Sequence, residues 1–155
     1  MKTKNNLLKT TIIAIVRLLA NHAFAQNTQT VKTYHDPWTK TQLAEVYTVL
    51  QNTPTKHGNY KKYDKRGTLI EDKNFSNGQF HGTCKTFYNA FLAQVYDNPK
   101  DWYGKIAEVL NYSKGELHGS AEEYHYLYGK QQLKYQRVYA NGAMTKNTEY
   151  HNNGN

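Results

Sequence analysis

The chain has 155 residues, enough for one domain or for about four to five small repeats. Only 38% of the residues are hydrophobic and the mean hydropathy is −0.88, which excludes a thick apolar core, and the 14 tyrosines supply much of what can be buried. The formal net charge of +8 comes from basic residues that alternate with acidic ones, which argues against nucleic-acid binding because such proteins carry a basic stripe.

Residues 1–25 have the organisation of a secretory signal peptide. Three lysines are followed by an apolar stretch over residues 12–20, and Ala23-Phe24-Ala25 forms a small-residue cleavage site before Gln26. Arg17 interrupts the apolar stretch, which leaves open a short amphipathic helix that stays attached. Four of the 20 basic residues lie in this segment, so the mature part would carry 16 against 12 acidic residues, a net charge of +4. We expect export, with membrane contact only through this signal.

The next two segments differ in character. Residues 26–40 are polar and contain Asp36-Pro37, which indicates a linker or a loosely docked N-terminal arm. The apolar residues of 41–50 fit helical spacing, but LAEVYTV at 43–49 also resembles IAEVLNY at 106–112. The internal resemblance favours a strand.

One sixteen-residue phrase organises the rest of the chain. GTLIEDKNFSNGQFHG and GKIAEVLNYSKGELHG share Gly, Glu, Asn, Ser, Gly, His and Gly at the same places. Related segments recur with a period of about 26 residues, and a period in that range indicates a repeat architecture. The repeat domain is therefore expected over 41–155, in units near 43–66, 67–103 with an insertion at 89–103, 104–128, and an incomplete 129–155.

The phrase predicts a β-hairpin. Asn77-Gly78 lies between residues of strand type, and a two-residue type I′ turn needs the positive φ that Asn tolerates and Gly adopts freely. Lys114-Gly115 and Asn141-Gly142 hold equivalent places. The fold class predicted is all-β, a repeat protein of successive antiparallel hairpins forming one extended, twisted, single-layer sheet. Its structural glycines are Gly58, Gly67, Gly78, Gly82, Gly104, Gly115, Gly119, Gly129 and Gly142.

Aromatic residues are divided between a structural and a binding role. Tyr63, Phe87 and Tyr124 each follow a repeat glycine by five residues, so we expect one structural row. The insertion carries Trp102, one of only two tryptophans, and Trp102 and Tyr103 are the candidate binding residues. The alternative is that these two continue the aromatic pattern of the strands. If they bind a partner, Trp102 substitution weakens binding more than stability.

The search for reactive groups predicts no catalytic residue, metal site or cofactor. Three histidines precede a repeat glycine and are 24 and 37 residues apart, which favours a turn role over metal ligation: His57, His81 and His118. Cys84 is alone, so no disulfide framework exists, and it is expected as a small buried residue rather than a free thiol. Three glutamates share one repeat position, which favours a solvated row over paired catalytic acids: Glu45, Glu71 and Glu108.

The order of glycines and aromatics resembles the MORN-repeat variant of bacterial proteins, many of which are classed as a YwqK-like antitoxin family. The resemblance covers about residues 43–154 and is best in 58–82 and 104–129. The matching residues are Gly58, Tyr60, Tyr63, Gly67, Leu69, Phe75, Asn77, Gly78 and Gly82. The chain departs from the pattern at Thr83-Cys84, at Ala121 and at Lys146, where an aromatic, an aromatic and a glycine are usual.

The resemblance implies a sheet of successive hairpins without enzymatic activity. Together with the expected export signal, it leads us to expect a non-catalytic module of the bacterial envelope, periplasmic, on the outer surface or secreted. Such a module would bind or scaffold a protein or a glycan. The alternative is an antitoxin or immunity-type protein that neutralises a toxin partner.

Overall fold

A computed structural model describes residues 27–89, 102–127 and 130–151. The expected signal peptide, most of the insertion and Gly129 lie outside the described residues. The described chain forms one antiparallel sheet of ten strands. In chain order the strands are β1 (Thr28–Tyr34), β2 (Leu43–Leu50), β3 (Lys56–Tyr63), β4 (Leu69–Ser76), β5 (Gln79–Phe80), β6 (Gly82–Phe87), β7 (Ile106–Ser113), β8 (Glu116–Leu127), β9 (Lys130–Ala140) and β10 (Ala143–Glu149).

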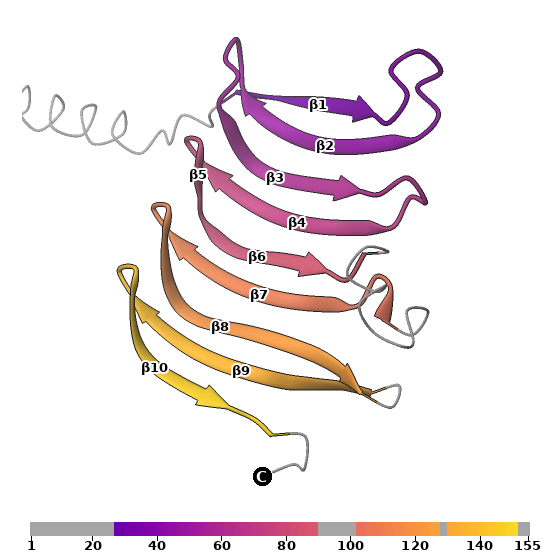
Figure 1. Ribbon diagram of the computed structural model, residues 1–155. Helices are drawn as coiled ribbons and strands as arrows, with labels where there is room; N and C mark the ends of the chain where they lie inside the picture. The colour runs from indigo at the N-terminus through magenta and orange to yellow at the C-terminus, as the bar shows by residue number, and fades with distance from the viewer. Residues whose placement is uncertain (1–26, 90–101, 128–129, 152–155) are drawn as a thin grey trace, which may run out of the picture.

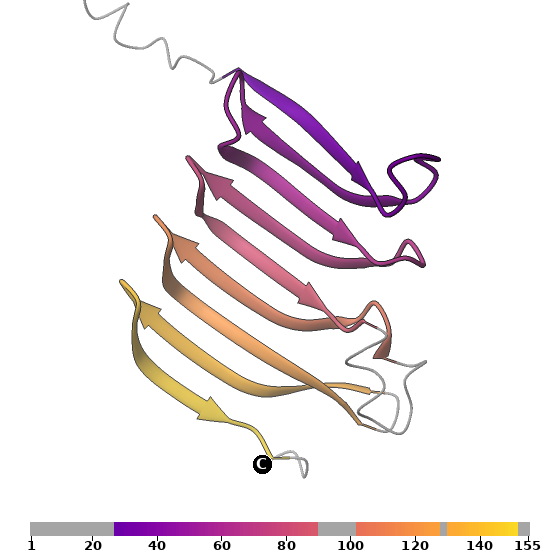
Figure 2. The ribbon, with the colours of Figure 1, turned by 45° about the horizontal axis from the view of Figure 1, so that its top comes forward.

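The strands follow one another across the sheet in the order β1-β2-β3-β4-β6-β7-β8-β9-β10, with β5 paired to β4. Figures 1 and 2 show a single layer of curved strands, with the tight turns between β4 and β5, β7 and β8, and β9 and β10 along one side. The longer connections between β1 and β2 and between β3 and β4 lie on the opposite side. The predicted single-layer sheet of successive hairpins is confirmed.

The three tight turns have the backbone that the hairpin prediction required. Asn77 and Gly78 have φ values of 50° and 82°, and the turns at Lys114-Gly115 and Asn141-Gly142 have nearly the same values. Each turn glycine donates its N–H to a carbonyl of the preceding unit: Gly78 to Lys56, Gly115 to Phe80 and Gly142 to Leu117, at 2.8–2.9 Å. Successive turns are thereby held in register by the backbone.

The His-Gly pairs form a repeated bulge that the sequence did not reveal. Residues 47–49 of β2 oppose residues 56–60 of β3, and residues 110–112 of β7 oppose residues 117–121 of β8. In both cases the return strand carries two extra residues within the segment that contains His-Gly. Where Lys146 replaces the glycine in the last hairpin, the offset shrinks to one residue. A bulge of this kind bends the strand and increases its local twist.

The asparagine shared by the two phrases satisfies the backbone beside this bulge. Asn74 donates its side-chain N–H to the carbonyl of Thr83 at 3.2 Å, and Asn111 donates to the carbonyl of Ser120 at 2.7 Å. Both acceptors directly follow the bulge glycine. In the first unit Thr48 takes the asparagine's place and donates to the carbonyl of His57. The asparagine that the two phrases share therefore forms a structural hydrogen bond in both units.

The predicted N-terminal arm is wrong for residues 28–34, which form β1 and pair with β2 along their whole length. The segment TQTVKTY is rich in β-branched residues, which suit a strand. It is polar because β1 is the last described strand at its edge of the sheet and most of its side chains are exposed. The choice of strand over helix for residues 43–50 is confirmed by β2.

The aromatic contacts run along a different line from the predicted one. Tyr63, Phe87 and Tyr124 share a register position but pair with Leu69, Ile106 and Leu133 of the next strand. Equivalent strands are two strands apart, roughly 10 Å, and among the described residues no ring contact joins any two of these three side chains. The prediction of a stacked row is wrong for this reason. The ring contacts instead join neighbouring strands in an aromatic ladder, with centroids 4.8–6.0 Å apart, of Tyr47, Tyr60, Phe75, Phe80 and Tyr112.

A second cluster lies where the insertion rejoins the sheet. Tyr88, Trp102 and Tyr126 are 5–7% exposed and their ring centroids are 5.1–6.1 Å apart, with Ala107 packed against them. Tyr88 also donates its hydroxyl hydrogen to the carbonyl of Tyr124. Residues far apart in sequence therefore meet in a compact apolar cluster. In this single-layer sheet the cluster serves as a small hydrophobic core.

Candidate functional site

A row of polar residues crosses the sheet from strand to strand. Residues directly opposite one another in neighbouring strands point to the same face. The register places one such line across nine strands, which we call the glutamate row: Thr33, Glu45, Lys62, Glu71, Thr86, Glu108, Glu123, Tyr135 and Glu149. The three glutamates that the repeat predicted to align do share this row, and Glu123 and Glu149 join them.

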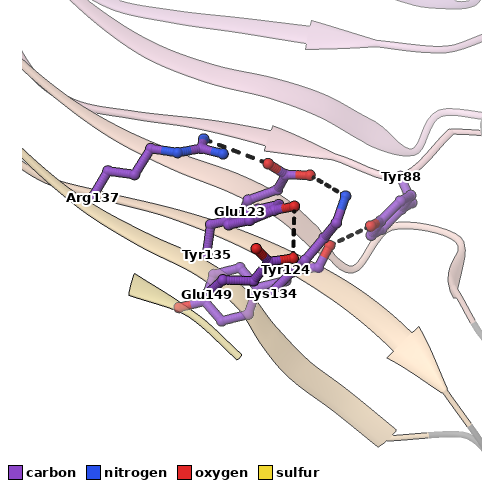
Figure 3. A network of polar contacts seen from close by, with 7 residues as sticks. All are labelled: Tyr88, Glu123, Tyr124, Lys134, Tyr135, Arg137 and Glu149. Atoms are coloured by element: carbon purple, nitrogen blue, oxygen red, sulfur yellow. Dashed lines mark hydrogen bonds and ion pairs between the residues drawn. The ribbon is translucent and has the colours of Figure 1, made fainter. Parts of the chain in front are cut away.

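Most carboxylates of the row have a partner. Glu71 lies 2.5 Å from the ammonium of Lys73 and 3.6 Å from that of Lys62. Figure 3 shows Glu123 between Lys134, at 2.9 Å, and Arg137, at 3.6 Å. Glu45 and Glu149 accept hydrogen bonds from tyrosine hydroxyls, Tyr60 at 2.9 Å and Tyr135 at 3.1 Å.

Glu108, at the middle of the row, differs from the others. Within the described residues its carboxylate has no ion pair and no hydrogen bond, and it stands directly opposite Glu123. Burial raises the pKa of the Glu108 carboxyl, and the charge of Glu123 raises it further, although Arg137 and Lys73 act in the other direction. A carboxyl whose pKa is perturbed by burial and a specific neighbour is a candidate for a functional role.

Replacing Glu108 with Gln is expected to stabilise the protein at neutral pH. The raised pKa means that ionisation is less favourable in the folded than in the unfolded state. This penalty is absent well below pH 4.5, the ordinary pKa of the group, and is complete above the raised value. The Tm gain of Glu108→Gln should therefore grow between acidic and neutral pH, as thermal unfolding at several pH values would show. A gain that does not change with pH would contradict the assignment, and Glu149→Gln at the exposed end of the row is the control.

The aromatic ladder lies on the same face as the glutamate row. Tyr60 is 6% exposed, and burial, followed by its hydrogen bond to Glu45, raises the pKa of its hydroxyl. The ammonium of Lys56 lies 4.3 Å from the centre of the Tyr60 ring and within 5.3 Å of those of Tyr47 and Phe75. The rings contact one another at angles of 36–76° rather than lying in one plane.

A second surface lies at the loop side of the sheet. The β1–β2 loop, residues 35–42, carries Trp38, whose side chain is 92% exposed. The loop is braced by Asp36, which accepts hydrogen bonds from the backbone N–H of Trp38 at 2.9 Å and from the hydroxyl of Thr39 at 2.9 Å. These hydrogen bonds lower the pKa of Asp36, with the bond from Trp38 as the largest cause. The sequence did not identify Trp38 as a candidate binding residue, because it lies within residues 26–40, the expected N-terminal arm.

A pocket of about 490 Å³ opens between this loop and the β3–β4 turn. Its lining residues come from both connections and from the strand ends beside them: Thr41, Gln42, Leu43, Tyr63, Lys65, Arg66 and Gly67. The β1–β2 loop is longer than the β3–β4 turn, and the two connections lie side by side (Figure 1).

The two predicted binding residues, Trp102 and Tyr103, have different surroundings in the structure. Trp102 is only 6% exposed, so its ring offers little surface to a partner, and its expected role as a contact residue is not supported. Tyr103 is half-buried, donates its hydroxyl hydrogen to Asp64 and lies under the guanidinium of Arg66 at 5.5 Å. Tyr103 thus supports the β3–β4 turn beside the pocket.

The remaining candidates have structural surroundings. Eight of the nine predicted glycines lie in the described part of the chain, and all eight have positive φ. The side chain of His57 accepts a hydrogen bond from the N–H of Asn77 at 3.3 Å, which is a turn contact. Cys84 is buried, as expected, with 5% of its surface exposed, and it lies on the face of the glutamate row. Burial raises its pKa.

No protein-family model matches this chain, and no curated protein is significantly similar to it. Across the described residues, histidine, cysteine, aspartate and glutamate form no group of three or more that could hold a metal ion. The same part of the chain contains no helix that is long and apolar enough to cross a membrane.

Proposed function

We propose that this protein is a non-catalytic, exported repeat module that binds a protein partner on the face carrying the glutamate row. The observation that carries the proposal is Glu108, a half-buried carboxylate that forms no ion pair among the described residues, while Glu71 and Glu123 each form two. A partner that presents a Lys or Arg side chain there would give Glu108 the ion pair that Glu71 and Glu123 already have. Electrostatic complementarity of this kind supplies specificity and register.

The aromatic ladder favours a protein over a glycan. A sugar ring stacks on the open face of an aromatic side chain, but these rings pack against one another and Lys56 lies over three of them. Rings that are tilted against one another beside charged residues suit an irregular protein surface better than a sugar ring. The resemblance of the repeat phrase to MORN-type proteins agrees with a scaffold of this kind, and a toxin remains the alternative partner.

Charge reversal at Glu108 tests the proposal. Partners would be captured from extracts of the source organism with the mature protein and identified by mass spectrometry, and their affinities would then be measured by calorimetry. Glu108→Lys is expected to weaken binding by at least about tenfold, or 1.4 kcal/mol. Glu116→Lys, at an exposed turn-side position, is the matched control and should leave affinity unchanged. Equal affinities of the wild-type protein and Glu108→Lys would contradict the proposal, and a captured toxin would favour the alternative.

A further inference from the structure

We propose that the pocket between the β1–β2 loop and the β3–β4 turn binds the C-terminal residue of a polypeptide, with its free carboxylate and an apolar side chain. This site lies at the loop side of the sheet and is independent of the glutamate row.

The pocket combines an apolar part with a cationic part. Leu43 and Tyr63 supply apolar surface, while Lys65 and Arg66 are the charged residues that line it. Its volume of about 490 Å³ lies within the range of small-ligand sites, roughly 300–1,000 Å³. A C-terminal residue carries its carboxylate and its side chain on the same carbon atom, so one residue can reach both parts at once.

The two cations are available to a ligand. Neither Lys65 nor Arg66 forms an ion pair with any residue that the structure describes. The nearby carboxylate, Asp64, is occupied by the turn itself, because it accepts the backbone N–H groups of Arg66 at 2.9 Å and Thr68 at 3.0 Å. Its second oxygen accepts the hydroxyl of Tyr103. These hydrogen bonds fix the turn, and Asp64 forms no ion pair with Lys65 or Arg66.

The position of Arg66 favours a carboxylate. Its guanidinium lies 5.5 Å from the centre of the Tyr103 ring, and this contact holds the group while leaving N–H donors on its edge. A guanidinium edge matches the two oxygens of a carboxylate in a bidentate pair. Lys65 adds a second positive charge at the same rim.

Trp38 indicates that the occupant extends beyond the pocket. Its side chain is 92% exposed on a braced loop that also contributes Thr41 and Gln42 to the pocket. Tryptophan is enriched at the centres of protein interfaces, and an exposed indole on an ordered loop is a suitable contact for residues that precede a C-terminus. A small free carboxylate would leave this surface unused, which is why we assign a polypeptide.

Calorimetry with the full-length protein tests the site, using the peptide acetyl-Gly-Ala-Gly-Phe with a free C-terminus as the probe. The same peptide amidated at its C-terminus should bind at least about tenfold more weakly. Arg66→Gln should weaken binding of the free peptide by a similar factor, whereas Lys85→Gln on β6 should leave its affinity unchanged. Arg66 is exposed in the turn, and an unaltered melting curve would show that Arg66→Gln still folds.

Several outcomes would overturn this assignment. Equal affinity for the free and amidated peptides would exclude carboxylate recognition, and an unaffected Arg66→Gln variant would exclude this pocket. Phenylacetate binding as tightly as the peptide would mean that a small free anion is the ligand. Inorganic phosphate displacing the peptide at lower concentration than acetate would exclude the preference for a carboxylate.

Discussion

Replacing Trp102 with alanine is expected to destabilise the folded protein by about 3–5 kcal/mol, the usual cost of removing a buried large aromatic side chain. Trp102 packs against Tyr88 and Tyr126, and both lose this ring contact when it is removed. A single-layer sheet has few other buried groups, so little can compensate. Equilibrium unfolding in urea measures the change directly. This expected result is the opposite of the expectation from sequence, that Trp102 affects binding more than stability.

Trp38→Ala is the matched control for this substitution. Its side chain is 92% exposed, so the free energy of unfolding should change by less than about 0.5 kcal/mol. Similar losses for the two variants, or a larger loss for Trp38→Ala, would mean that the cluster around Trp102 does not stabilise the fold.

Gly58→Ala is expected to cost about 2–5 kcal/mol, the second-largest effect. Gly58 has a φ of 86°, a region that costs an L-residue about 1–2 kcal/mol. A Cβ there would also lie 2.7 Å from the hydroxyl oxygen of Thr48, which is held by its bond to the carbonyl of His57. Overpacking of this kind adds about 1–3 kcal/mol. Unfolding in urea again gives the value.

Gly67→Ala separates the two causes. Gly67 has a similar φ of 81°, but a Cβ there would meet no atom within 4 Å, so only the conformational cost of about 1–2 kcal/mol applies. In a Thr48→Ala background the clash disappears, and Gly58→Ala should then cost no more than Gly67→Ala. Equal costs of Gly58→Ala in both backgrounds would show that Thr48 does not restrict this position.

The hairpins could be predicted from sequence because their determinants are local. A two-residue turn depends on the residues at Asn77-Gly78, and the repetition of the phrase supports the same interpretation three times. β1 could not be predicted in this way. Its polar sequence follows from its place at the edge of the described sheet, which only the order of strands reveals.

The candidate sites depend on contacts that no local pattern encodes. Trp102 is buried because Tyr88, directly after β6, and Tyr126 of β8 meet at the end of the insertion. Glu108 was identified as one of an aligned set, but it lacks an ion pair because Lys62 and Lys73 pair with Glu71, and Arg137 pairs with Glu123. The pocket arises from two connections that are 20 or more residues apart in sequence.

The division of the two tryptophans into an exposed contact residue, Trp38, and a buried stabilising residue, Trp102, depends on their exposure to solvent. Iodide quenching of tryptophan fluorescence measures this exposure most directly. In Trp102→Phe the remaining Trp38 should emit at long wavelength and be readily quenched by iodide, because its side chain is 92% exposed. In Trp38→Phe the remaining Trp102, 6% exposed, should emit at shorter wavelength and be protected. A protected Trp38 together with a readily quenched Trp102 would contradict the account.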